Sequence, residues 1–340
     1  MLSYIDFLPI EGNHAGNKAR MDINNICKDM NLQCITKIKE IKFISVYDKV
    51  KYILSPRNIY QIIYLMLKRK EITLLQYPFY FNPIMKYALH AYNKHNKTVL
   101  LIHDVDSLRA FGESETNKEI DVFNNANVLI VHNNNMKQRL IQLGVKTPMI
   151  SLDIFDYILD DVISNNSMEN DIVFAGNLGK SKFLNDIKNT EISINLYGPG
   201  YANSMNGENV KYKGSYPSDE IPYVISGKFG LIWDGDSLNT CSGDVGRYLK
   251  YNNPHKLSLY IASGLPVIVW RESAIAEFVS THNIGVLIDS IHQIKDIIDK
   301  MNGNEYEMMK KNVLSVQKSI CKGDYTKAAI KKAVSILDER

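Results

Sequence analysis

The sequence has few cysteines, little net charge and no long apolar run. Its four cysteines, Cys27, Cys34, Cys241 and Cys321, are far apart and include no CxxC pair, so neither a zinc site nor a disulfide framework is expected. A net charge of +3 over 340 residues is too small to favour a nucleic-acid partner. No apolar run reaches the roughly 18 residues that a membrane-spanning helix needs. These absences indicate a globular protein of a reducing compartment.

The N-terminal residues lack the marks of a secretion signal. Met1–Ile10 is mostly apolar, but Asp6 interrupts it and no basic segment precedes it, so we expect a first strand there. We therefore predict a cytoplasmic protein. A peripheral position at the inner face of the cell membrane stays open, because the basic run Lys68–Lys70 could contact lipid, although a solvated helix end is the commoner meaning of such a run.

The sequence does contain a repeated alternation of short apolar runs with longer amphipathic stretches. Hydrophobic residues make up 45% of the chain and charged residues 23%, as in ordinary globular proteins. The apolar runs have no polar face, which is typical of parallel strands covered by helices on both sides. The predicted strands are Ser3–Ile10, Leu32–Ile38, Ile72–Tyr77, Thr98–His103, Val128–His132, Pro148–Leu152, Asp171–Ala175, Ser193–Tyr197, Val210–Tyr212, Phe229–Trp233, Pro266–Trp270 and Val286–Ile288. The predicted helices are Lys18–Met30, Val46–Lys70, Pro83–His95, Thr116–Asn125, Met136–Leu143, Ser181–Lys188, Ser218–Ser226, His255–Ser263, Ala274–His282, Ile291–Met301, Glu305–Lys318 and Tyr325–Asp338.

Chain length and one break in this alternation predict two domains. The break is the polar stretch within 160–170. We expect an α/β domain over residues 1–155, a connection over 156–170, a second α/β domain over 171–322 and a C-terminal helix over 323–340 that could pack back on the first domain. Parallel sheets bind ligands beyond the carboxyl ends of their strands, so the active cleft should lie between the domains.

Two of the four notable loops at predicted strand ends belong to the first domain. One contains Gly16, Asn17, Lys18 and Arg20, whose small residues and cations suit a phosphate or a sugar. It matches neither the P-loop nor the GxGxxG pattern, and a tight turn that needs glycine explains it equally well.

The other loop of the first domain, H-D-V-D, contains Asp104 and Asp106. Either carboxylate could accept a proton from a substrate hydroxyl or cap a helix. The same D-V-D pattern resembles the metal-binding DxD of a fold with a single nucleotide-binding domain. Because this chain has two such domains, we predict no metal site here.

The remaining two loops belong to the second domain. Asn177 and Lys180 lie in a glycine-rich turn before Ser181, where a helix is expected to begin, and such a turn can bind an anion or simply be a capped connection. The most informative segment contains W-D-G-D, with Asp234, and then N-P-H-K at 253–256.

In N-P-H-K, Pro254 suits the first turn of a helix and Asn253 is expected to cap it. His255 and Lys256 would then lie at a positive helix end, where a diphosphate is stabilised. A structural role alone does not explain why a cationic segment should begin a buried helix.

These motifs, in this order, resemble a bacterial group of GT-B-fold glycosyltransferases. The resemblance rests on N-N-P-H-K-x-S-L-Y at 252–260 with W-D-G-D and C-S-G ahead of it, on A-G-x-K-A-R-x-D at 15–22, on L-I-H-D-x-D-x-L-R at 101–109, on the segment 154–159 and on A-G-N-L at 175–178. The group includes O-antigen β-1,6-galactofuranosyltransferases and the glucosyltransferases that extend glycans on serine-rich-repeat adhesins. The galactofuranosyl branch is the more similar, through W-D-G-D and C-S-G.

The resemblance implies an α/β, GT-B protein whose two Rossmann-like domains have parallel sheets facing a central cleft. The first domain would bind the acceptor and the second a UDP-sugar, without a metal or other cofactor. Lys180 replaces an arginine of the adhesin branch. The E-x7-E pair of retaining GT-B enzymes is absent, since Glu272 and Glu277 have the wrong spacing, which favours inversion. By motif, the UDP contacts would fall on Gly16, Asn17, Lys180, Tyr216 and Lys256.

We therefore predict direct displacement at the anomeric carbon, with galactofuranose favoured and glucose next. Asp104 or Asp106 would deprotonate the acceptor hydroxyl, and Asp22 is the next candidate base. Lys180, Lys256 and helix N-termini would stabilise the leaving UDP in place of a metal. Further candidate ligands of the donor are Lys18, Arg20, Asn177, Asp234, Asn253 and His255.

The acceptor is expected to be a lipid-linked or protein-linked glycan of a surface polysaccharide or glycoprotein, and a homo-oligomer stays open. Two other classes of function also stay open. One is a nucleotide-sugar epimerase or hydrolase, and the other is a non-catalytic nucleotide-binding subunit of a glycosylation complex.

Overall fold

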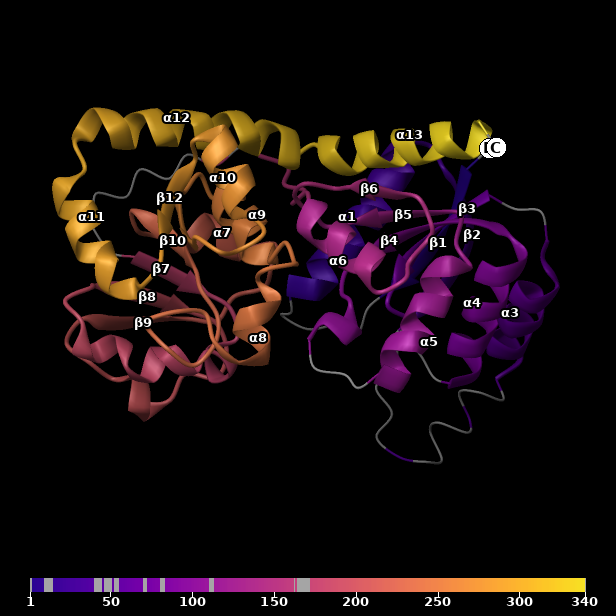
Figure 1. Cartoon of the computed structure of the whole chain (residues 1–340), viewed down its shortest axis with the longest axis horizontal. Coiled ribbons are helices and arrows are strands. Elements are labelled where there is room, and N and C mark those ends of the chain that lie inside the picture. Colours follow the sequence, from indigo (N-terminus) through magenta and orange to yellow (C-terminus); the bar gives the residue numbers. More distant parts are fainter. Residues whose placement is uncertain are drawn as a thin grey trace.

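The computed structural model of the chain describes residues 2–8, 15–39, 45, 51, 55–69, 72–79, 83–109, 113–161, 163 and 172–339. In this part of the chain two lobes lie side by side, each built on a parallel sheet with helices on both faces (Figure 1). The expected α/β class with two Rossmann-like domains is confirmed. No helix of the described ranges is long and apolar enough to cross a membrane.

The first lobe has the strand order β2-β1-β3-β4-β5-β6, and all its pairings are parallel. Its central strands are buried along their length because apolar side chains occupy both faces of the pleat. The order reverses between β1 and β3, which is where such a sheet opens a ligand crevice. The strands are β1 Leu2–Leu8, β2 Gln33–Lys39, β3 Ile72–Tyr77, β4 Lys97–Ile102, β5 Val128–Val131 and β6 Met149–Ser151. The helices are α1 Ala15–Asp29, α3 Pro56–Leu67, α4 Pro83–His95, η1 Asp106–Leu108, α5 Glu113–Asn124 and α6 Asn134–Gln142.

The second lobe has the strand order β12-β11-β10-β7-β8-β9, again with parallel pairings. Its order reverses between β7 and β10, the second crevice position of the molecule. The strands are β7 Ile172–Ala175, β8 Ile194–Tyr197, β9 Val210–Gly214, β10 Phe229–Ile232, β11 Val267–Trp270 and β12 Gly285–Ile288. The helical segments are η2 Leu178–Lys180, η3 Lys182–Asn185, η4 Ile187–Asn189, η5 Asn203–Met205, α7 Ile221–Val224, α8 Gly243–Tyr248, α9 His255–Ala262, α10 Ala276–His282, η6 Ile291–Gln293, α11 Ile294–Lys300, α12 Gly303–Ile320 and α13 Asp324–Asp338.

The last two helices connect the lobes. Figure 1 shows α12 along the second lobe and α13, in yellow, along the first, and α13 packs against α1, β5 and β6. Asp156, in the connection between the sheets, accepts hydrogen bonds from the backbone N–H groups of Tyr325 and Thr326 at 3.3 and 2.7 Å. Its carboxylate therefore caps the first turn of α13, a position that favours negative charge.

The single helix predicted over Ser181–Lys188 is wrong. The chain forms two short 3-10 segments there, η3 and η4, directly after η2. The carbonyl of Ile187 accepts from the side chains of Thr190 and Asn209 at 2.7 and 3.1 Å, and side chains that bond to backbone groups compete with helix formation. The helix expected over Ser218–Ser226 is only the four-residue α7, and α8 was not predicted.

The contact between β10 and α9 requires glycine at position 230. A Cβ built on Gly230 would lie 2.2 Å from the ring of Tyr260, whose hydroxyl accepts from the N–H of Ala175 at 2.8 Å. We predict that Gly230→Ala lowers the free energy of unfolding by about 1–3 kcal/mol, as overpacking does. Gly303→Ala, at the start of α12 with nothing within 4 Å, should raise it slightly. Urea unfolding measures both, and equal midpoints would contradict this packing.

Asp156 generates a pH-dependent prediction. Burial raises the pKa of its carboxyl from the ordinary 3.8 to about 7, and the bonds from Thr326 and Tyr325 offset this only in part. Between about pH 4 and 7 the folded protein thus binds more protons at this site than the unfolded chain, so this contribution to stability falls as pH rises. As pH rises from about 4 to 7, the free energy of unfolding of the wild type should fall relative to that of Asp156→Asn. Denaturant unfolding of both proteins at several pH values measures this difference.

The control is Asp338→Asn, an equal charge change at the exposed far end of α13. A similar pH slope in this variant would assign the effect to net charge and not to the capping carboxylate.

Candidate active site

A pocket of about 330 Å³ lies at the carboxyl ends of β7, β8 and β9. This is the edge of the second sheet at which ligands bind in open parallel folds, and the volume suits a small-molecule ligand. The N-terminus of α9 forms one of its walls. The pocket is lined by Tyr157, Ala175, Gly176, Asn177, Lys180, Tyr197, Gly198, Pro199, Ser215, Tyr216, Ser218, Ile221, Pro254, His255, Lys256 and Leu259.

Lys256, in the first turn of α9, supplies a cation to this pocket. Its Nζ lies 2.7 Å from Asp234 Oδ1 and 4.6 Å from the ring centre of Phe174. A Cβ on Gly176 would lie 3.0 Å from Lys256 Cε, so the loop after β7 needs a small residue for the lysine stem to pass. An ammonium has three donors, and the pairing with Asp234 uses one of them.

Three more of the predicted ligands line the same pocket. Asn177 caps η2 by accepting from the N–H of Lys180 at 3.2 Å, which fixes the turn in which Lys180 lies exposed. The hydroxyl of Tyr216, which also lines the pocket, donates to the carbonyl of Lys213 at 3.0 Å. The ring of Tyr216 packs against Tyr197, with 6.4 Å between ring centres. The pocket therefore combines a cationic end with aromatic walls.

His255 is the first residue of α9 and also lines the pocket. Burial, aided by the charge of Lys18, lowers the pKa of its imidazole to about 3, so the ring is neutral at pH 7. Neither ring nitrogen has a hydrogen-bond partner among the described residues, and the ring contacts Phe155 and Tyr157. Unpaired buried polar groups are uncommon in folded proteins and call for an explanation beyond packing.

Asn253 does not cap α9, contrary to the prediction. The helix begins at His255, Pro254 occupies the N-cap position, and no side chain bonds to the first turn. The amide of Asn253 instead donates to the carbonyls of His132 and Asp153 at 2.6 and 3.0 Å and accepts from Asn133 at 2.7 Å. Because these partners belong to the first lobe, Asn253 positions α9 across the domain interface and does not line the pocket.

Asp104 lies where the two lobes meet. Its Oδ1 accepts from Arg109 at 2.7 Å and from the hydroxyl of Tyr248, on α8 of the second lobe, at 3.3 Å. The side chain is 27% exposed, and burial raises its pKa although Arg109 opposes the shift. A raised pKa and partial exposure suit a proton acceptor.

Asp106 has a different local backbone from Asp104, because the short helix η1 begins directly after Val105. Asp106 begins η1, and the N–H groups of Asp106 and Ser107 donate to the carboxylate of Glu119 at 3.1 and 2.9 Å. The two aspartates therefore do not share one extended segment. Neither lines the 330 Å³ pocket.

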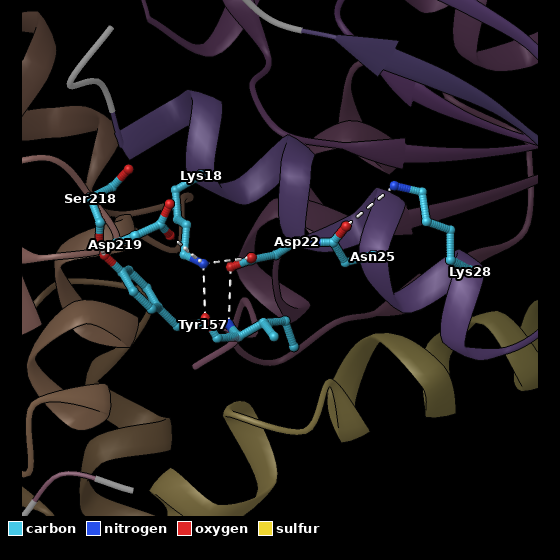
Figure 2. Close-up of polar contacts among 8 residues, drawn as sticks. Lys18, Asp22, Asn25, Lys28, Tyr157, Ser218 and Asp219 are labelled. Atoms are coloured by element: carbon cyan, nitrogen blue, oxygen red, sulfur yellow. Dashed lines mark hydrogen bonds and ion pairs between the residues drawn. The ribbon is translucent and has the colours of Figure 1, made fainter. Parts of the chain in front are cut away.

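Lys18 and Asp22 lie on α1 and form an interdomain ion-pair cluster with Asp219 of the second lobe (Figure 2). The Lys18 Nζ is 2.7 Å from Asp22, 3.0 Å from Asp219 and 2.8 Å from the carbonyl of Ile158. Burial lowers the pKa of Lys18, but Asp22 and Asp219 outweigh burial and the pKa is raised, so the ammonium stays charged.

Both oxygens of Asp22 are engaged, since the second accepts from the N–H of Ile158 at 3.0 Å. Burial raises its pKa to about 7, and Lys18 offsets this only in part. Asp22 thus lies in the ion-pair cluster and not at the pocket. The ion-pair cluster is nevertheless next to the pocket through Tyr157. The Lys18 Nζ lies 5.0 Å from the centre of the Tyr157 ring, and the Tyr157 hydroxyl donates to the carbonyl of Ser218.

The other predicted residues of the first loop belong to helix α1, which begins three residues earlier than expected. Arg20 is buried and donates to the carbonyl of Pro78 at 2.6 Å, so it anchors α1 to the end of β3. Gly16 and Asn17 lie in the first turn of α1. The rest of that loop, 11–14, lies outside the described residues.

A second hollow of about 350 Å³ lies between the lobes, beside Asp104. Four cations line it, two from the first lobe (Arg109 and Arg139) and two from the second (Arg247 and Lys250). No carboxylate lines it in the described part of the chain. Three of these cations are already paired with a carboxylate, Arg109 with Asp104, Arg247 with Asp244 and Lys250 with Glu272, so the hollow is not an open anion site.

Sequence reasoning missed several pocket and interface residues. Tyr157 lies within a segment that the family resemblance covers, but its pattern carries no chemical signal of its own. Ser218 and Asp219 follow Tyr216 in the polar S-Y-P-S-D loop, which could have marked them. Tyr248 could not be found, because it meets Asp104 only through the docking of the lobes. In the described ranges, no group of three or more His, Cys, Asp or Glu side chains could hold a metal ion.

Comparison with known proteins relates this architecture to one family. The model of the glucosyltransferase 3-like N-terminal domain matches residues 4–154, and that of the corresponding C-terminal domain matches residues 172–333. The chain is 30% identical to the beta-1,6-galactofuranosyltransferase WbbI of Escherichia coli K12 over 288 residues, which cover 81% of this chain and 82% of that protein. It is 24% identical to glucosyltransferase 3 of Streptococcus gordonii over 241 residues, 70% and 71% of the two chains.

Among solved structures, HepE of Anabaena in complex with UDP-glucose aligns with a TM-score of 0.60 at 12% identity, covering 99% of this chain and all of that one. This similarity establishes the GT-B fold. Together with the matches to both domain models and to WbbI, it shows that the chain belongs to the glucosyltransferase 3-like family of GT-B glycosyltransferases and is itself a glycosyltransferase.

Proposed function

We propose that this glycosyltransferase moves a hexosyl group from a UDP-sugar to a glycan acceptor, with inversion and without a metal. The observation that carries the proposal is the 330 Å³ pocket, in which aromatic walls meet two lysines and the N-terminus of α9 at the carboxyl edge of the second sheet. A nucleoside diphosphate has the same two-part chemistry, a flat ring joined to a dense negative charge.

The two parts of the pocket suit the two parts of UDP. Lys180, Lys256 and the first-turn N–H groups of α9 offer positive charge to the diphosphate. The rings of Tyr197 and Tyr216 offer apolar surface to the base and ribose. Support comes from HepE, which shares the fold and is described in complex with UDP-glucose.

Galactofuranose is the favoured sugar and glucose the next. WbbI, at 30% identity over most of both chains, is named a galactofuranosyltransferase. The relatives named glucosyltransferases share 24% and 25% identity. The acceptor would be a lipid-linked or protein-linked glycan.

Asp104 is the preferred base for the acceptor hydroxyl. It lies at the meeting of the lobes, it is partly exposed, and its pKa is raised, whereas both oxygens of Asp22 are engaged. In an inverting displacement the acceptor oxygen attacks the anomeric carbon while its proton passes to the base, and the bond to the UDP oxygen breaks. The lysines and helix dipole would stabilise the charge that develops on UDP, in the role that a metal has elsewhere.

The proposal is tested first by nucleotide binding. Lys256→Ala should weaken UDP binding by roughly 1.5–3 kcal/mol, the range for a charge-assisted hydrogen bond, while uridine should bind both forms equally because it lacks the phosphates. Calorimetry in EDTA measures these affinities, and binding that requires added manganese would contradict a metal-free site.

The control for this test is Lys182→Ala. Lys182 is exposed, lies 3.8 Å from Asp236 and does not line the pocket, so UDP should bind this variant as it binds the wild type. An equal loss of uridine and UDP in Lys256→Ala would assign Lys256 to the fold and remove the main support for the diphosphate site.

The base is tested by turnover. Asp104→Asn should lower kcat by about 10²–10⁴-fold, with UDP affinity unchanged, whereas Asp106→Asn should have a smaller effect. The base must be ionised, and its pKa is raised. As the pH is lowered, wild-type activity should therefore begin to fall at a higher pH than an ordinary carboxyl group would give, and Asp104→Asn should not show this fall. UDP release from UDP-galactofuranose and UDP-glucose, each with and without a glycan acceptor, measures the rates.

These assays also separate the alternative functions. Equal UDP release with and without acceptor would favour a hydrolase, and an altered free sugar nucleotide would favour an epimerase. Tight UDP binding without any product would favour a non-catalytic subunit. A loss of less than tenfold in both aspartate variants would place the base elsewhere.

A further inference from the structure

The helix α3 is apolar on its outer face as well as on the face that packs inward. Ile62, Tyr64 and Leu65 pack against the core, and the amide of the buried Gln61 donates to the carbonyl of Lys37 at 2.7 Å. The outward residues are also largely apolar. A helix of a soluble domain normally turns its apolar stripe toward the core, so packing within this domain does not explain the stripe on α3.

The outward stripe consists of Ile59, Tyr60, Ile63, Met66 and Leu67. Their spacing of three and four residues places them on one face of the helix, and Tyr60 and Leu67 are 68% and 71% exposed. Isolated exposed apolar residues need no explanation, whereas a concentrated apolar face indicates an interaction surface.

The neighbouring helix α4 extends the apolar surface. It packs beside α3 on the first lobe (Figure 1) and exposes Ile84 and Tyr87. Seven of the fifteen large exposed apolar residues in the described part of the chain lie on these two helices, although the helices contain only 12 and 13 residues.

The charges on α3 and α4 all have one sign. Neither helix contains Asp or Glu. The basic residues are Arg57 on α3, Lys86 and Lys94 on α4, and Lys68 and Arg69 directly after α3. Apolar and aromatic side chains mixed with cations match the interface of an anionic bilayer, where the rings and aliphatic groups enter the headgroup boundary and the cations meet the lipid phosphates.

We propose that α3 and α4 form a docking surface for an anionic lipid membrane. A second copy of the chain fits less well, because a symmetric contact through this face would bring the same cations together without any carboxylate on either helix. This inference does not depend on the proposed donor, acceptor or base.

Vesicle sedimentation with the full chain tests the proposal. The protein should bind vesicles of phosphatidylcholine with about one third phosphatidylglycerol, bind phosphatidylcholine alone much less, and lose binding as salt screens the charges. Ile63→Ser together with Leu67→Ser should weaken binding about tenfold or more, because the apolar contribution is lost. Lys86→Gln with Lys94→Gln should weaken it by about fivefold for each charge removed.

Matched controls change the same chemistry on other faces. Ile141→Ser with Met308→Ser removes two apolar residues of similar exposure on α6 and α12, and Lys331→Gln with Lys332→Gln removes two exposed charges on α13. Both should bind vesicles as the wild type does. Unchanged melting temperature and UDP binding in all variants show that the fold and the nucleotide pocket are intact.

Three results would overturn the proposal. The first is no binding of the wild type to anionic vesicles. The second is equal weakening in the test and control variants. The third is a dimer in analytical ultracentrifugation that Ile63→Ser with Leu67→Ser dissociates while vesicle binding is absent, which would assign the face to a second copy.

Discussion

The arrangement of the two lobes depends on a buried ammonium group. Lys18 is only 5% exposed, and a buried charge must be paired. Its partners come from its own helix, from the connection and from the second lobe, namely Asp22, the carbonyl of Ile158 and Asp219. Separating the lobes would leave Lys18 paired with Asp22 on its own helix but would remove Asp219, so the pairing with Asp219 is the part of the cluster that joins the lobes. Burial raises the pKa of Asp22, whereas pairing with Asp22 and Asp219 raises the pKa of Lys18. A buried ion-pair cluster of this kind specifies geometry and is not by itself evidence of added stability.

The docked arrangement in turn positions both parts of the active site. Asn253, two residues before α9 begins, bonds to His132 and Asn133 of the first lobe. This contact positions the first turn of α9, with Lys256, at the 330 Å³ pocket. On the same interface Tyr248 reaches Asp104 and the N–H of Val105. The candidate base and the candidate diphosphate site are therefore fixed by one interface, although they lie on different lobes.

The polar side chains of the interface and the outer face of α3 have a common feature. In both places local pattern and burial disagree, with charged or amide groups inside and apolar groups outside. Sequences tend to be locally consistent with their fold except where function intervenes. At the interface, the buried polar groups join the two lobes. On α3, the exposed apolar groups lie on the side that faces away from the sheet.

The strands and the class of fold could be predicted from the sequence, because short apolar runs bounded by turns and separated by amphipathic stretches indicate buried parallel strands. Asn177, Lys180, His255 and Lys256 were candidates from the loops at strand ends, and Tyr216 was a candidate from the family resemblance. All five line one pocket, since loops after parallel strands converge at one edge of the sheet. The roles of Lys18, Asp22 and Asn253 follow only from the folded protein: Lys18 and Asn253 were candidate ligands and Asp22 a candidate base, but all three join the lobes. Apart from the Lys18–Asp22 pair within α1, their partners lie 100 or more residues away in the sequence, as with Asn253 and Asp153, and no local pattern records such a distance. At Ser181–Lys188 two short 3-10 segments replace the expected helix, and the carbonyl of Ile187 there accepts from the side chain of Asn209, a partner 22 residues away that no local pattern shows.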